Sequence, residues 1–425
     1  MTTTTKNNTL DSLLSQVPNG SSFSDLRKSS RDFLEKNGLP AIKEEEYKFT
    51  AITKKLENSI SDFSFAKKAS LNNEIIQSHM FGGFEGDLLV FNNGFFEREL
   101  STISNNGYTL SLISDAKPEL LGKIAATEKD PFVALNNISF GDGIYLKVSK
   151  NQKVEKPILF LFLNQSNDGQ VIHSRILIEV EDNAEVTFLE DSVSLDDKTY
   201  FSNMVTEIKV GQNSQVHYNR LQNESKNAIT VNNTETDIHR DAVFTSVVVS
   251  LSGDMVRNNL SLNLLDSSCE GNMYGLYLLN GKTHVDNHTN VDHTKPHAQS
   301  NELYKGVLAD SSRGVFNGKI FVRQDAQKTN YLQKNKNILL NVDSMINTKQ
   351  NLEIWADDVK CSHGCTTGQL DEEALFYLRA RGLGKEQARG MLLYAFTGEV
   401  MDHISDEAFQ NHIVNIVQNR LGSNF

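Results

Sequence analysis

Apolar and polar residues alternate in short runs from about residue 140 onward. In the run ILIEVE at 176–181, the apolar residues Ile176, Ile178 and Val180 alternate with Leu177, Glu179 and Glu181, as a half-buried strand requires. Runs of this kind, roughly four to eight residues long and bounded by Gly, Asn or Asp, continue for about 200 residues without helical periodicity. The pattern therefore predicts a domain made mainly of β-strands.

One of these runs returns about thirty residues later. Residues 180–188 (VEDNAEVTF) match residues 210–218 (VGQNSQVHY), and residues 241–244 (DAVF) are a looser copy. A second pair of similar segments, at 267–278 and 311–321, is offset by about 43 residues. Such repeats predict the coils of a β-helix, which bury their apolar faces on one another. A β-sandwich also has short, regularly spaced strands and stays open on this pattern alone.

Helical patterns precede the strand-rich region. Residues 24–37 carry an apolar stripe that Ser24 can cap and Gly38 can end, and an extended acidic segment follows at 44–50. A strand candidate at 87–91 leads into an Asn-Asn-Gly turn. This part of the chain therefore predicts a small mixed α/β region.

The segment after Gly368 predicts three helices. Acidic residues at 371–373 open the first helix, and arginines followed by Gly382 close it, in agreement with the helix dipole. The second helix places four apolar residues on one face: Ala388, Met391, Leu392 and Ala395. The third helix, which Ser405 can cap, carries an apolar face of Phe409, Ile413, Ile416 and Val417.

These patterns together predict a mainly β chain with four parts. A disordered N-terminus covers 1–22, and a helical and mixed α/β region covers 23–135. The β-helix core covers 136–366, and a C-terminal helical domain covers 367–425.

Composition narrows the classes of function. The 425 residues include 23% charged and 38% hydrophobic residues, as expected of a globular protein. The net charge of -12 repels phosphate backbones, so we expect no nucleic-acid partner. Because the apolar runs are too short to span a bilayer and no signal sequence is evident, we expect a cytoplasmic protein. Three cysteines do not make a disulfide framework.

One segment is similar to a phosphate-binding loop. In the run GLYLLNGKT at 275–283, the glycines are separated by one residue more than the motif allows. The residues after it do not favour a helix, whose N-terminus would have to hold the phosphate. We therefore predict a strand and its turn, with no ATP site. Signatures of hydrolases, zincins and dehydrogenases are also absent from the sequence, which disfavours an enzyme.

Two groups of residues are candidates for metal binding. The first is a stretch of histidines, His284, His288, His293 and His297, interleaved with Asp286 and Asp292. Imidazole and carboxylate groups suit iron or zinc, but the spacing does not keep these side chains on one face of a strand. Hydrogen bonding between coils is therefore the favoured interpretation, and a metal site stays open.

The second group is the run CSHGC at 361–365. Cys361, His363 and Cys365 occupy alternate positions, so in an extended segment all three can face one side. A thiolate beside an imidazole is nucleophilic and a soft metal ligand. Three ligands cannot complete a tetrahedral structural site, so either the site is open or a partner chain completes it. A buried cysteine and a hydrogen-bonded histidine without such a function are an equally open interpretation.

The residues around this run are similar to the SufD proteins of the SUF iron-sulfur cluster assembly system, within the SufB/SufD family. The similar C-terminal block comprises DDVKCSHGCT at 357–366, GQLD at 368–371 and LFYLRARG at 375–382. The other similar blocks are GLP at 38–40 with EYKFT at 46–50, DPFVALN at 130–136, and segment 288–308, which ends in KGVL. The paralogue SufB shares part of this pattern, but CSHGCT and the chain length are typical of SufD.

The resemblance implies a right-handed parallel β-helix core with helical ends. It also implies a scaffold subunit without turnover, paired with a SufB-like paralogue and carrying a SufC-like ATPase on its C-terminal helices. In that family a transient iron-sulfur cluster is thought to form at the interface with SufB, and no stably bound cofactor is expected. His363 matches the functional histidine and Cys361 its neighbouring thiol.

Some properties stay open under the resemblance. Cys365 stands where relatives often have a small residue, so its role is open, as are the cluster type, flavin binding, the sulfur donor's docking surface and the oligomeric state of the isolated chain, for which a homodimer is one option. The rival hypothesis is an enzyme with an open metal site at Cys361 and His363, or around His288 and His293. Against this hypothesis, the general base or second carboxylate that an autonomous metal hydrolase needs is missing near Cys361 and His363.

Overall fold

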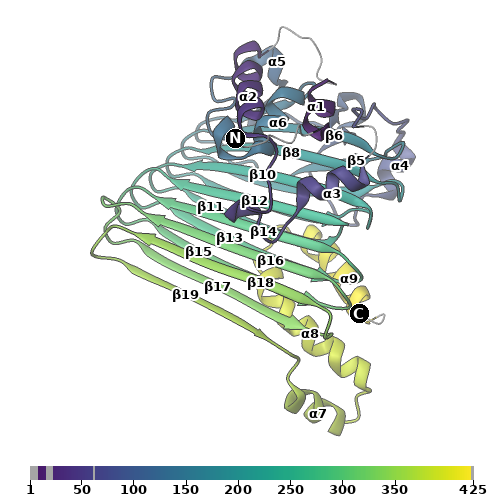
Figure 1. Ribbon diagram of the computed structural model, residues 1–425. Coiled ribbons are helices and arrows are strands. Elements are labelled where there is room, and N and C mark those ends of the chain that lie inside the picture. The colour runs from purple at the N-terminus through teal and green to yellow at the C-terminus, as the bar shows by residue number, and fades with distance from the viewer. Residues whose placement is uncertain (1–7, 16–22, 61–62, 423–425) are drawn as a thin grey trace, which may run out of the picture.

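The computed structural model describes residues 8–15, 23–60 and 63–422 (Figure 1). Two sheets pack face to face and form a β-solenoid of about eight turns. Sheet A contains β3 (Tyr108–Leu112), β4 (Ile144–Val148), β6 (Gln170–Val180), β8 (Tyr200–Val210), β10 (Ala228–Ile238), β12 (Met255–Leu264), β14 (His284–His293), β16 (Arg313–Val322) and β18 (Met345–Ile354). Sheet B contains β1 (Asp87–Asn92), β2 (Phe95–Phe96), β5 (Ile158–Asn164), β7 (Glu185–Ser194), β9 (Gln215–Asn223), β11 (Val243–Ser252), β13 (Glu270–Leu279), β15 (Gln299–Leu308), β17 (Asn330–Leu339) and β19 (Lys360–Gly368).

Successive strands alternate between the two sheets from β4 to β19, and each pairs in parallel with the strand two places further on. The thirty-residue repeat is therefore one coil: Val180 lies beside Val210, and Phe188 beside Tyr218. The predicted β-helix is confirmed, and the β-sandwich is excluded. The segments 275–278 and 318–321 lie in β13 and β16, on opposite sheets, so the 43-residue offset does not correspond to a coil.

The main core lies between the two sheets. Strand residues of one parity point into it, including Ile176, Ile178 and Val180, which confirms the predicted inward face. The glycine-containing run at 275–283 is the end of β13 and a turn, and β14 follows directly without a helix. The strand-and-turn prediction for that run is therefore confirmed.

The N-terminal region covers the outer face of sheet A and part of sheet B (Figure 1). It contains α1 (Asn8–Ser15), α2 (Ser24–Asn37), the 3₁₀ turn η1 (Glu45–Tyr47), α3 (Ile52–Ser59), α4 (Asn73–Ser78), the 3₁₀ turn η2 (Arg98–Leu100), α5 (Ile113–Ala116), the 3₁₀ turn η3 (Thr127–Lys129) and α6 (Pro131–Ser139). Side chains of α1, α2, α3 and α6 pack with outward-facing residues of β8 and β10 such as Phe201 and Val231. This apolar layer fixes the region to the solenoid.

Several N-terminal predictions need correction. Asn8–Ser15 are helical with Leu13 buried, whereas the rest of the predicted disordered segment 1–22 lies outside the described residues. Ser24 does not cap α2, because Phe23 precedes the helix in a left-handed conformation and no side chain bonds the first turn. The acidic segment 44–50 contains the turn η1 and is not extended, because its side chains fold onto sheet A. The Asn-Asn-Gly turn after β1 is confirmed, since β1 and β2 form a hairpin.

Three helices follow the solenoid in the described chain: α7 (Glu372–Ala380), α8 (Lys385–Met401) and α9 (Glu407–Gly422). Asp371 caps α7 as the acidic start predicts. The predicted face of α8 is correct at Ala388, which is fully buried, but wrong at Met391, which is exposed, because Leu393 packs against the outer face of sheet B instead. Asp406, not Ser405, caps α9. Both α8 and α9 lie on sheet B, whereas α7 extends beyond the solenoid (Figure 1).

Candidate functional site

The run CSHGC lies on β19, the last strand of sheet B. Only one edge of β19 is paired, with β17, and β18 ends sheet A in the same way, so the final coil is open within the described part of the chain. Cys361, His363 and Cys365 lie beside Tyr331, Gln333 and Asn335 respectively. These three partners are buried in the solenoid interior. The side chains of the run therefore share the inward face of the open coil, as their alternation predicts.

The cysteines of this run differ in their surroundings. Cys361 is half-buried and packs against the main core, and this burial raises the pKa of its thiol above the usual value. The protonated thiol is thus favoured more than the sequence alone suggests, and deprotonation has to accompany metal binding. Cys365 is exposed, and its Sγ lies 3.3 Å from Oγ1 of Thr348 on β18 and 3.8 Å from Oδ1 of Asn335.

His363 is exposed at the opening between the two cysteines. Thiol and imidazole groups suit iron, but within the described residues no three His, Cys, Asp or Glu side chains are grouped closely enough to hold a metal ion. The arrangement is therefore an incomplete set of soft ligands at an open end, and ligands from another molecule could complete it. The third cysteine, Cys269, is buried near the turn before β13 and takes no part in this site.

The structure does not bring the four histidines of residues 284–297 together. His284 and His288 lie on the outer face of sheet A, where His284 Nε2 is 2.9 Å from Oγ1 of Thr50. His293 faces the interior, with Nε2 2.8 Å from Oγ of Ser300. His297 occupies a turn with a left-handed backbone. Hydrogen bonding is the role that these contacts support for His284 and His293.

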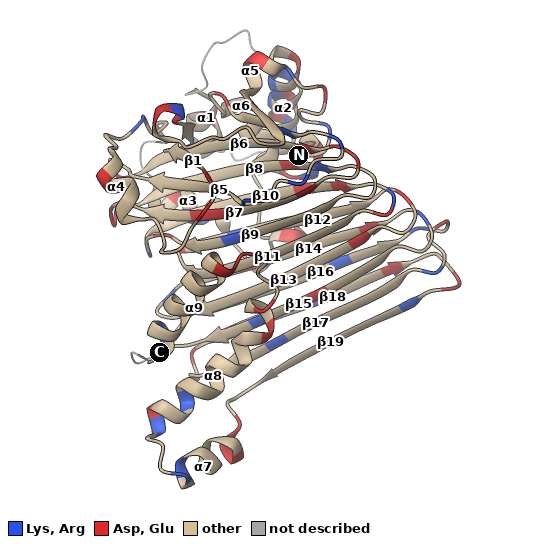
Figure 2. Cartoon of the chain, turned by 180° about the vertical axis from the view of Figure 1, so that it is seen from behind, with Lys and Arg blue, Asp and Glu red and all other residues tan. Residues whose placement is uncertain are grey.

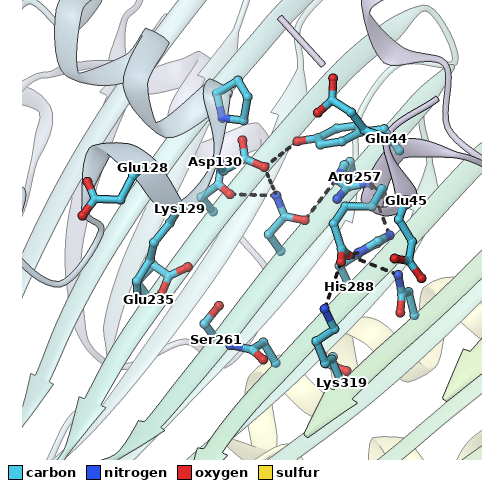
Figure 3. Close-up of a pocket in the computed structure, with 18 of the residues that line it drawn as sticks. Glu44, Glu45, Glu128, Lys129, Asp130, Glu235, Arg257, Ser261, His288 and Lys319 are labelled. Carbon is cyan, nitrogen blue, oxygen red and sulfur yellow. Dashed lines mark hydrogen bonds and ion pairs between the residues drawn. The ribbon is translucent and has the colours of Figure 1, made fainter. Parts of the chain in front are cut away.

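A polar cavity of about 630 Å³ lies over the outer face of sheet A, beneath residues 44–47 and 128–131 (Figure 3). His288 lies 3.0 Å from Asp286 and 3.4 Å from Glu46, and Lys319 lies 3.1 Å from Glu46. The hydrogen bond with His288 is the main cause that lowers the pKa of Glu46 to about 2, although its desolvation acts against the shift. These ion pairs attach the acidic segment to β14 and β16.

Two further cavity residues were not predicted from the sequence. Arg257 on β12 is buried and lies 2.9 Å from Asp286, and Asp130 accepts a hydrogen bond from the Tyr47 hydroxyl. Burial raises the pKa of the Asp130 carboxyl. The coil length is the sequence signal that could have identified the pair of Arg257 and Asp286. These two residues are 29 residues apart and lie side by side on neighbouring coils. The basic and acidic groups that line the cavity are largely paired with one another, and the pairs that involve Glu46 hold the N-terminal region on the solenoid.

Along the ribbon, basic and acidic residues are interspersed in the turns of the solenoid, in the N-terminal helices and on α7 and α8 (Figure 2). Among the described helices, none combines the length and apolar character needed to cross a membrane.

Comparison with known proteins gives two family matches. Residues 162–396 match the family model "SUF system FeS cluster assembly, SufBD core domain", and residues 13–160 match "SufBD protein N-terminal region". An iron-sulfur cluster assembly SufBD family protein of Synechocystis is 31% identical over 91% of this chain and 88% of its own length. The iron-sulfur cluster assembly protein SufD of Escherichia coli is 30% identical over 91% of this chain and 90% of its own. The SufD protein of Bacillus subtilis is 26% identical over 69% of this chain and 68% of its own.

Proposed function

The chain belongs to the SufBD family of the SUF iron-sulfur cluster assembly system, and we propose that it is the SufD-type scaffold subunit. In this role it pairs with a SufB-like paralogue, carries a SufC-like ATPase and performs no turnover of its own. The observation that carries the proposal is the incomplete set of soft ligands on the inward face of the open coil.

His363 and Cys361 supply part of the site at which a transient cluster forms, and the SufB-like partner supplies the remaining ligands. The cluster is the cargo of the assembly and does not stay bound to this chain. Two features support a partner at the open coil. The outer edges of β18 and β19 have no strand partner in the described chain, and such edges readily pair with another chain. Exposed apolar side chains also lie at both ends of β18, namely Met345 at its start and Ile354 and Trp355 at its end.

The ATPase subunit binds the C-terminal helices, with α7 as the main contact. Phe376 is 72% exposed and Tyr377 is 56% exposed on α7, which extends beyond the solenoid (Figure 1). Large exposed aromatic side chains on a projecting helix are typical of a protein interface. The helices α8 and α9 bury apolar side chains on sheet B, so they serve chiefly to hold α7 in place. The complex operates in the cytoplasm, and in the absence of SufB the same open coil can pair with a second copy of this chain.

Reconstitution with SufB and SufC tests the site. Iron and acid-labile sulfide are measured on complexes that contain the wild-type chain, His363→Ala or His297→Ala, after size-exclusion chromatography has shown that each complex is intact. We expect His363→Ala to lose most of the bound cluster. His297→Ala changes a histidine in the turn between β14 and β15, two coils before the turn that precedes β19, and should load as the wild type does. Equal loading of all three complexes would show that the site is assigned wrongly.

A further inference from the structure

Glu302 on β15, Gln333 on β17 and His363 on β19 lie in register on neighbouring strands of sheet B. All three positions face the solenoid interior, and neighbouring strands are about 4.8 Å apart. Glu302 is 3% exposed and Gln333 is fully buried, whereas His363 lies at the opening. A polar line therefore leads from the candidate site into the interior.

The orientation of the Gln333 amide is held from two sides. Its Nε2 donates a hydrogen bond of 2.6 Å to Oε2 of Glu302, which also accepts a bond of 3.3 Å from the Tyr331 hydroxyl. On the facing strand β16, a Cβ at Gly318 would lie 2.0 Å from this same Nε2, so the amide fills the space that the glycine leaves. Glu302 thus fixes which end of the amide is the nitrogen.

The other end of the amide is unused. Gln333 Oε1 is buried and has no hydrogen-bond partner in the described part of the chain. Leaving a buried acceptor unpaired costs on the order of 1–3 kcal/mol, so such an atom in a native interior needs an explanation. The next residue in the same column is His363, whose ring carries an N–H group at any pH.

We propose that Gln333 is a positioning residue for His363: when the exposed His363 ring turns towards the interior, the free amide oxygen of Gln333 accepts a hydrogen bond from one ring N–H and leaves the other ring nitrogen for the cluster. Histidines that bind metals almost always donate their second N–H to an oxygen acceptor, which sets the tautomer and the direction of the ring. Glu302 contributes by fixing the orientation of the Gln333 amide through its hydrogen bond with Nε2. The role of this hydrogen bond between Gln333 and His363 in cluster binding rests on the proposed function, but the formation of the bond does not.

The tautomer of His363 tests the proposal directly. The full chain is labelled with ¹⁵N-histidine, and long-range ¹H–¹⁵N spectra are recorded at pH 8, above the pKa of about 7 that burial gives Glu302. His363→Ala identifies the His363 signals. We expect a single tautomer in the wild type and a mixture of both in Gln333→Leu. The double variant Glu302→Gln with Gln333→Glu places a carboxylate acceptor beside His363 and should show a single tautomer, as the wild type does.

Gln222→Leu is the matched control, because Gln222 is also a buried inward amide but lies on β9, several strands from β19. It should leave the His363 signals unchanged, and circular dichroism shows which variants are folded. A mixture of tautomers in the wild type, or an unchanged single tautomer in folded Gln333→Leu, would overturn the proposal.

Cluster loading separates this proposal from the proposed function. In the reconstituted complex, Gln333→Leu is expected to lower iron affinity about tenfold, whereas Gln222→Leu does not. Full loading of His363→Ala would refute the proposed function while leaving the tautomer result intact. If His363→Ala loses the cluster and Gln333→Leu keeps the wild-type tautomer, only the positioning role is refuted.

Discussion

Glu207→Ala should release part of the N-terminal region from the solenoid. Glu207 lies on β8 and is fully buried on the outer face of sheet A. Its carboxylate accepts hydrogen bonds from the backbone N–H groups of Gly122, Ile124 and Ala125, at 3.0 to 3.1 Å. It also forms an ion pair with the buried guanidinium of Arg175. One side chain thus neutralises a buried cation and holds a loop.

The expected loss of stability follows from these contacts. Removing one partner of a buried ion pair typically costs about 3–5 kcal/mol, because the other charge stays buried. Each buried N–H left without an acceptor adds about 1–3 kcal/mol, although relaxation and water reduce the sum. We therefore expect Glu207→Ala to lower the free energy of unfolding by at least about 4 kcal/mol. Glu207→Gln keeps an acceptor for the loop and should cost less.

Urea unfolding and hydrogen exchange followed by mass spectrometry measure this effect. Peptides that cover residues 120–126 should exchange much faster in Glu207→Ala, while peptides from β13 to β17 should keep most of their protection. Glu185→Ala is the control, since Glu185 is 48% exposed and lies 3.4 Å from Lys153, and exposed pairs contribute about 1 kcal/mol or less. If Glu207→Ala unfolds within about 1 kcal/mol of the wild type and residues 120–126 stay protected, Glu207 does not hold this loop on the solenoid.

Four further predictions follow from individual contacts. Phe376→Asp should weaken binding of the SufC-like ATPase more than tenfold in calorimetric titration without changing the melting temperature, and unchanged affinity would argue against α7 as the contact. Gly275→Ala should destabilise by about 1–3 kcal/mol in urea, because its Cβ would lie 2.1 Å from a buried tyrosine ring, whereas Gly398→Ala, with open space around its Cβ, should not. Cys361 should react with iodoacetamide more slowly at pH 8 than a free thiol, since burial raises its pKa; an equal rate, measured by mass spectrometry, would contradict this. Burial holds the pKa of His293 at about 3, below its unfolded value of about 6.5, so its neutral form stabilises the fold fully above pH 6.5 and this contribution falls as the pH drops towards 3; His293→Gln should flatten that part of the curve of urea midpoint against pH.

The fold could be predicted from the sequence wherever the period of the pattern matched a repeating contact. Side chains of a strand alternate between two faces, so Ile176, Ile178 and Val180 were assigned inward correctly. The match between 180–188 and 210–218 worked because one coil has about this length. The 43-residue offset failed because one and a half coils bring a segment to the opposite sheet. Similarity between two segments alone cannot distinguish these cases.

The helix faces were harder to predict, because the partner surface decides which residues are buried. On α8, Met391 and Ala395 fit an apolar stripe but face solvent, while Leu393 and Val400 meet the outer face of sheet B. The acidic segment 44–50 failed for a related reason, since its turn forms around bonds to residues more than 200 positions away.

At the candidate site, some features could be predicted from the local sequence and others depend on residues of distant coils. The alternation of Cys361, His363 and Cys365 on one strand face was visible locally, and their failure to complete a ligand set indicated an open site. Gln333 and Glu302 could not be identified locally, because each lies about one coil from the next in the column. In a solenoid, a residue's neighbours in space recur at the coil length, so once that length is known, each ligand can be traced to the residues behind it. For His363 this column leads to an amide oxygen without a partner in the described chain, so under the proposed function the interior, as well as the interface, should influence how the histidine binds the cluster.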